Sequence, residues 1–153
     1  MTRRDYARAV CVGTLEPNPR DVALNVLVAQ MYAESGPALC DGTHGARNNP
    51  LNTTLPTRGS QPTTFNSAGV QNYRDPADGV AAVISTLRQQ NFTPVRNALM
   101  DRSLGGFNVA KVIESSPWGT GKVLTDVLAD YHKRPSFYDD LLVGTDHSIG
   151  VQA

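Results

Sequence analysis

The sequence has no excess of charge of either sign, because its 14 Lys and Arg residues are matched by 14 Asp and Glu residues. A nucleic-acid footprint or a membrane-surface segment needs a cationic excess, so we expect neither partner. The chain also has only two cysteines, Cys11 and Cys40, which is too few for a disulfide framework. Free thiols are therefore the default expectation, with a single disulfide as the alternative.

Internal repeats, charge runs, low-complexity tracts and a phosphate-binding glycine loop are also lacking. The basic N-terminus is followed by no sustained apolar core and no small-residue cleavage site, so no signal peptide is predicted. The 153 residues show no shift in composition, which favours a single domain over residues 1–132. A polar tail over residues 133–153 is expected to be loosely attached, with apolar side chains that could dock as a turn: Phe137, Tyr138, Leu141 and Leu142.

Residues 19–36 form a stretch that is apolar almost all the way round a helix. A helix without a polar face is one that the rest of a domain surrounds, and this one is too short and too interrupted to span a membrane. Asn18 is expected to cap the helix, Pro19 to occupy its first position, and Gly36 to end it. The stretch therefore predicts a buried central helix.

Glu34, one of only three Glu residues, lies at the C-terminal end of this predicted helix. Burial and the negative end of the helix dipole both disfavour its charged form, so its pKa is expected to be raised. A carboxylic acid that stays protonated near neutral pH is suited to act as a general acid. The alternative interpretation is a solvated residue at a frayed helix end.

Residues 36–74 are rich in Gly, Pro, Asn, Ser and Thr and have no helical period. Since so long a structureless loop is unusual in a compact domain, we predict a small β-hairpin lobe with strands at Leu51–Leu55 and Gly69–Tyr73. Apolar periodicity and cap residues predict helices over 2–13, from Asp75 to about Gln90, from residue 92 or 93 to 100, from about 106 to 114, and over 123–131. The predicted class is mainly α, of α+β type, with about six helices.

Three motifs occur in an order that resembles lysozyme-like muralytic enzymes. AQMYAESG is similar to the end of their catalytic helix, where Ser follows the acidic Glu. NNPLNT and the later GVQNYRDPADGVAAVISTL resemble the flagellar-muramidase and autolysin type of glucosaminidase. SPWGTG is similar to a turn in lysozyme-like domains of phage lysins and tail proteins, and the resemblance covers about residues 20–125.

The resemblance implies a lysozyme-like fold and cleavage of the β-1,4-linked glycan strand of peptidoglycan by a glucosaminidase, muramidase or lytic transglycosylase, with no metal or other cofactor. It places the general acid on Glu34 and gives Ser35 the role of orienting that acid. Asn48 and Asn49 fall at the turn that shapes the cleft floor, and Tyr73 at the tyrosine beside the reacting sugar. From the residues alone, Tyr73 is equally a hairpin core residue and the two Asn residues equally turn formers.

The chain departs from hydrolytic members of the family because residues 42–74 contain no Asp or Glu. Asp41 and Asp75 are the nearest candidates for a second carboxylate. We therefore predict a single-acid mechanism, in which an acetamido or hydroxyl group of the substrate meets the positive charge on the sugar. Glu34 then performs both proton transfers.

The main alternative is a non-catalytic virion structural or cell-wall-binding module on the same scaffold, because a fold does not determine a function. Cys40 with His44 would suit a cysteine peptidase or a metal site. However, no helix start follows Cys40 to lower its thiol pKa, and two further metal ligands are missing. Peptidoglycan is thus the expected partner, reached through a holin or within a phage particle, where other virion proteins would be further partners.

Overall fold

A computed structural model describes residues 1–14, 18–36, 40–43, 45–118, 123–134 and 137–138. In these residues the chain is mainly helical with one two-stranded antiparallel sheet, which confirms the predicted class. The helices are α1 (Arg3–Thr14), α2 (Asp21–Ser35), α3 (Pro76–Leu87), the short 3₁₀ helix η1 (Gln90–Phe92), α4 (Thr93–Met100), α5 (Gly106–Glu114) and α6 (Val123–Lys133). The strands are β1 (Ser60–Thr64) and β2 (Gln71–Tyr73). No described helix has the length and apolar character needed to cross a membrane.

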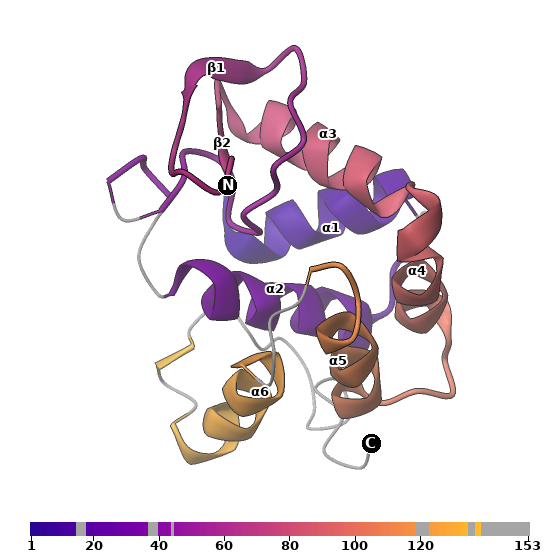
Figure 1. The fold of residues 1–153 in the computed structure, drawn as a ribbon. Coiled ribbons are helices and arrows are strands. Elements are labelled where there is room, and N and C mark those ends of the chain that lie inside the picture. Colours follow the sequence, from indigo (N-terminus) through magenta and orange to yellow (C-terminus); the bar gives the residue numbers. More distant parts are fainter. Residues whose placement is uncertain (15–17, 37–39, 44, 119–122, 135–136, 139–153) are drawn as a thin grey trace.

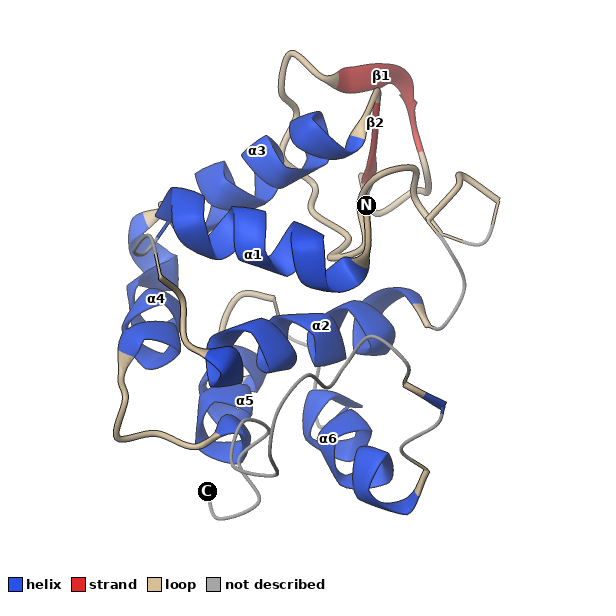
Figure 2. Cartoon of the chain, turned by 180° about the vertical axis from the view of Figure 1, so that it is seen from behind, coloured by secondary structure: helices blue, strands red, loops and turns tan. Residues whose placement is uncertain are grey.

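Helix α2 lies across the middle of the molecule (Figure 1). Helix α1 packs between α2 and α3, while α5 and α6 pack on the opposite side of α2, an arrangement that the view from behind also shows (Figure 2). Every residue from Ala23 to Tyr32 is buried, so the helix is enclosed on all sides. The predicted buried central helix is confirmed, and its C-terminal end leads toward the hairpin lobe.

The start of α2 lies two residues later than predicted, at Asp21. Arg20 is extended and precedes the helix, and its guanidinium donates to the backbone carbonyls of Ala98 and Leu99 in the last turn of α4 and of Leu104 after it. Asn18 and Pro19 therefore lie outside the helix, and this part of the prediction is wrong. The predicted end is confirmed, since Gly36 has a φ of 68° and donates its N–H to the Tyr32 carbonyl.

Two polar side chains, Asn25 and Gln30, are fully buried on α2, and they differ in their partners. The Asn25 side-chain oxygen accepts a hydrogen bond of 2.8 Å from Arg4. Neither side-chain polar atom of Gln30 has a partner in the described part of the chain. An unpartnered buried amide destabilises a fold, because it loses its bonds to water and gains none.

We therefore expect Gln30→Met to raise the free energy of unfolding by about 1–3 kcal/mol, the usual penalty for an unpartnered buried polar group. Urea unfolding of the two proteins measures the difference. Asn25→Leu is the matched control, and it should lower the free energy of unfolding because it removes the hydrogen bond that Arg4 donates to the Asn25 side chain. A Gln30→Met variant less stable than the parent by about 1 kcal/mol or more would show that the amide is bonded in the folded protein.

The hairpin pairs β1 with β2, with Ser60 opposite Tyr73, Thr64 opposite Gln71 and an irregularity between these pairs. The second predicted strand is thus confirmed, although it begins after a turn at Gly69, whose φ is 85°. The predicted strand Leu51–Leu55 is wrong, and β1 takes its place. Asn52 has a φ of 52°, which interrupts an extended strand, so residues 51–55 form an anchored loop.

Cap residues and apolar periodicity in the sequence predicted the later helices to within a few residues. The Asp75 carboxylate caps α3 by accepting from the backbone N–H of Asp78 at 2.9 Å, and Pro76 is the first helical residue, as predicted. Helix α3 ends at Leu87 rather than near Gln90, because the chain tightens into η1. The remaining helices lie within a few residues of their predicted ranges, while Gly119–Gly121 of the predicted turn lie outside the described residues.

The described part of the C-terminal tail docks through Tyr138. This side chain is buried and meets the Tyr32 ring edge to face, with 5.0 Å between ring centroids. Its hydroxyl donates to Asp130 on α6 at 2.5 Å. The tail thereby contacts the C-terminal half of α2, as expected of its apolar side chains, while Leu141 and Leu142 lie outside the described residues.

Candidate active site

A groove of about 540 Å³ opens beside the C-terminal end of α2, with Glu34 in its wall. Residues 51–56 and the turn between β1 and β2 contribute to its lining, as do α3, η1 and residues 117–118. Glu34 is the only ionisable side chain among the described residues that line it. The other polar and aromatic lining residues are Asn52, Thr53, Thr54, Thr86, Gln89, Asn91, Phe92 and Trp118.

The Glu34 carboxyl is partly buried, and this burial raises its pKa above the ordinary value. A hydrogen bond from Asn52 acts in the opposite direction and is the weaker influence. The predicted direction is therefore confirmed, with burial as its main physical cause. Such a carboxyl holds its proton to a higher pH than an exposed glutamate and can donate it to a molecule in the groove.

Asn52 holds Glu34 at two points. Its side-chain N–H₂ donates to the Glu34 backbone carbonyl at 2.9 Å and to Oε2 of the carboxyl at 3.2 Å. The sequence interpretation missed this residue because it assigned Leu51–Leu55 to a strand. The signal was present, since Asn tolerates the left-handed conformation that a turn requires, and Asn52 follows the pair Asn48-Asn49 closely.

An aromatic pair contributes to the lining of the groove. The rings of Phe92 and Trp118 meet edge to face, with 5.2 Å between their centroids, and both residues line the groove. Aromatic faces and amides are the groups that hold sugars in uncharged binding sites. Trp118 thus anchors the fold and contributes to the groove.

Asn49 and Tyr73 are not among the described residues that line the groove, and both are fully buried. The Asn49 amide donates to the carbonyls of Thr53 and Gln71 and accepts from Thr53. The Tyr73 hydroxyl donates to the Leu55 carbonyl at 2.8 Å. The structure therefore gives both residues the alternative, structural role, which is to hold the loop at residues 51–55 against β2.

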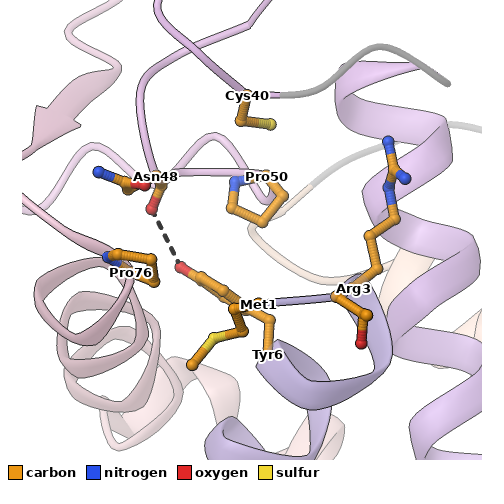
Figure 3. Close-up of a pocket in the computed structure, with 8 residues that line it drawn as sticks. Met1, Arg3, Tyr6, Cys40, Asn48, Pro50 and Pro76 are labelled. Atoms are coloured by element: carbon orange, nitrogen blue, oxygen red, sulfur yellow. Dashed lines mark hydrogen bonds between the residues drawn. The ribbon is translucent and has the colours of Figure 1, made fainter.

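Asn48 and Ser35 are likewise not among the described residues that line the groove. The Ser35 hydroxyl donates to the Pro50 carbonyl at 2.8 Å, so it fixes the turn rather than the Glu34 carboxyl. Asn48 lines a second pocket of about 380 Å³ between α1 and this turn. In Figure 3 the Tyr6 hydroxyl points at the Asn48 carbonyl oxygen, to which it donates at 3.3 Å.

Cys40 lines the same second pocket, and burial raises the pKa of its thiol. A raised thiol pKa disfavours the thiolate that a cysteine peptidase needs. Cys40 and Cys11 are both free thiols, while His44 lies outside the described residues. In the described ranges no three His, Cys, Asp or Glu side chains gather as a metal site would require.

Neither candidate for a second carboxylate lines the groove. The Asp41 carboxylate accepts from the backbone N–H of Thr43 at 2.8 Å, and Asp75 is the cap of α3. The groove, as far as the described residues define it, therefore contains a single carboxyl group, on Glu34.

No protein-family model matches the chain, and neither a curated protein nor a solved structure matches it. The function is therefore inferred from the groove and from the motifs of the sequence.

Proposed function

We propose that this chain cleaves the glycan strand of peptidoglycan, with Glu34 as the general acid. The observation that carries this proposal is a partly buried carboxyl that is the only ionisable group among the described lining residues, which otherwise supply amides, hydroxyls, apolar side chains and aromatic rings. Sugars suit such a lining, because they form many hydrogen bonds and stack on aromatic faces without needing a charge. The resemblance of AQMYAESG and NNPLNT to muralytic enzymes favours peptidoglycan as the polymer.

In the proposed reaction, Glu34 donates its proton to the glycosidic oxygen as the C1–O bond breaks, and the bonding electron pair leaves with that oxygen. The acetamido oxygen of the same sugar, or its C6 hydroxyl, forms a new bond to C1. In hydrolysis, water then attacks C1, the bond between C1 and the acetamido oxygen breaks, and the Glu34 carboxylate accepts a proton of that water. In transglycosylation, the carboxylate accepts the proton of the C6 hydroxyl as its oxygen bonds to C1. One enzymatic carboxyl is sufficient for this sequence, in agreement with the single carboxyl in the described groove.

A suspension of purified peptidoglycan tests the proposal. The protein should lower the turbidity of the suspension at a rate proportional to its concentration. A non-catalytic wall-binding module would sediment with the peptidoglycan and leave the turbidity unchanged, and this outcome would overturn the proposal. Comparing sedimentation and turbidity in the same samples therefore separates the two functions.

The pH dependence of activity follows from the direction of the Glu34 pKa shift. The acid is active while protonated, so kcat should fall as pH rises through the raised pKa of Glu34, above the ordinary value of 4.5. Because the pKa of Glu34 is higher in the folded than in the unfolded protein, the protonated side chain favours folding. This contribution to stability is fully present below the unfolded-state pKa and is lost as pH rises through the folded-state pKa. Initial rates across a pH series measure the first effect, and a kcat that rises through this range would show that Glu34 acts in its charged form.

A further inference from the structure

Asn52 is oriented by its two bonds to Glu34. Its N–H₂ group supplies one hydrogen to the Glu34 backbone carbonyl and the other to Oε2. A backbone carbonyl only accepts hydrogen bonds, so the N–H₂ end of the amide must face Glu34. The side-chain oxygen, Oδ1, therefore faces away from the acid, and it accepts no hydrogen bond within the described part of the chain.

This orientation favours one of the two carboxyl oxygens as the site of the proton. Because a carbonyl oxygen is a better acceptor than a hydroxyl oxygen, the N–H that Oε2 accepts from Asn52 favours the proton of the neutral acid on Oε1. Oε1 has no hydrogen-bond partner among the described residues, and Glu34 lines the groove. The O–H group of Glu34 and the acceptor Oδ1 of Asn52 therefore belong to two residues that bond to each other and that both line the groove.

We propose that Asn52 is a positioning residue, which holds the Glu34 carboxyl through its N–H₂ group and receives, through Oδ1, the N–H of the 2-acetamido group of the sugar being cleaved. This inference rests on the proposed function. When the acetamido oxygen bonds to C1 and the glycosidic oxygen leaves with the proton of Glu34, the acetamido nitrogen becomes positively charged. A carbonyl oxygen that accepts its N–H stabilises this charge where the described lining of the groove offers no second carboxylate.

The charged groups on helices packed against α2 do not compete with Asn52 for Glu34. Burial and Asn52 are the two influences on the Glu34 pKa within the described residues. Five of the charged side chains on those helices bond to groups other than the Glu34 carboxyl: Arg3, Arg4, Arg96, Glu114 and Asp130. A change at position 52 therefore acts on Glu34 without rearranging another ion pair.

Two variants test the inference without disturbing the turn. Asn52→Gly removes the side chain and tolerates the φ of 52°, while Asn52→Asp keeps the shape and replaces N–H₂ by an oxygen. Asn72→Asp is the matched control, because Asn72 bonds to Thr63 and Arg47 in the same lobe and does not line the groove. Each protein is studied by carbon NMR titration of the Glu34 carboxyl, by steady-state kinetics on soluble glycan, and by calorimetric binding of a thiazoline analogue of the bicyclic acetamido intermediate.

In Asn52→Asp, two adjacent carboxyls should share one proton and titrate in two steps, with the upper pKa above that of Glu34 in the parent. Asn52→Gly should lower kcat and weaken thiazoline binding roughly 10- to 100-fold, the effect of one hydrogen bond to a charged group, with a much smaller change in KM. Asn72→Asp should leave all three measurements close to those of the parent.

The inference is overturned if the parent protein cleaves glycan and Asn52→Gly keeps its kcat and thiazoline affinity within about twofold, well below the effect of one such bond. It is also overturned if the active parent does not bind the thiazoline. Failure of the proposed function has a different signature, namely a parent protein that releases no sugar ends at all. The contact between Asn52 and Glu34 is then still judged by the titration of Asn52→Asp, which must differ from that of Asn72→Asp.

Discussion

Glu34→Gln is expected to lower the rate of glycan cleavage by about 10²–10⁴-fold, the usual contribution of a general acid. The amide has nearly the same shape and keeps the fold, but it has no proton to give to the leaving oxygen. Folding of the variant no longer buries a carboxylate, so at neutral pH it should be at least as stable as the parent. Turbidity loss of purified peptidoglycan measures the rate, and urea unfolding measures stability.

Glu114→Gln is the matched control for this variant. Glu114 is also partly buried, but it accepts hydrogen bonds from the N–H and hydroxyl of Thr125 at the start of α6 and does not line the groove. Its replacement should lower stability and leave the specific activity of the folded protein unchanged. A Glu34→Gln variant that retains half of the parental rate would remove Glu34 from the mechanism.

Asn49→Ala is expected to lower the free energy of unfolding by about 3 kcal/mol or more. The change leaves the Gln71 carbonyl and the N–H of Thr53 without partners in the interior of the lobe, and each unpartnered buried group costs about 1–3 kcal/mol. Chemical denaturation measures the loss. Asn72→Ala, on the same lobe but only partly buried, should be affected much less.

The kinetics of the Asn49 variant distinguish the two roles considered for this residue. A structural role predicts an unchanged KM for the fraction of the protein that remains folded. The cleft-floor role implied by the family resemblance predicts a raised KM with little loss of stability. The second result would show that substrate reaches Asn49, in conflict with its complete burial.

The helices could be predicted from the sequence because their signals are local. Asp75, Pro76 and Asp78 supply a cap, a first-position proline and a capped N–H within four residues, and the structure forms that cap. The burial of α2, and with it the raised pKa of Glu34, followed from an apolar composition with no polar face. These features could be predicted because each leaves a signal in a short stretch of sequence.

The strand pairing and most of the groove could not be predicted because they depend on long-range contacts. Strand β1 reads SQPTT, with a proline and three exposed residues, so it has no apolar alternation by which to recognise it. Residues 51–55 have such a pattern, but the buried Asn49 amide and the left-handed Asn52 hold them as a loop. The contact between Asn52 and Glu34 spans 18 residues and arises from this loop.

The central claim, that Glu34 cleaves a glycan strand, is tested most directly by mass spectrometry of the fragments released from purified peptidoglycan. The account predicts new sugar ends in the digest of the parent protein and none in the digest of Glu34→Gln. Anhydro ends would indicate transglycosylation and reducing ends hydrolysis. Intact peptidoglycan, or fragments whose only new ends are amino groups of broken peptide bonds, would contradict the claim.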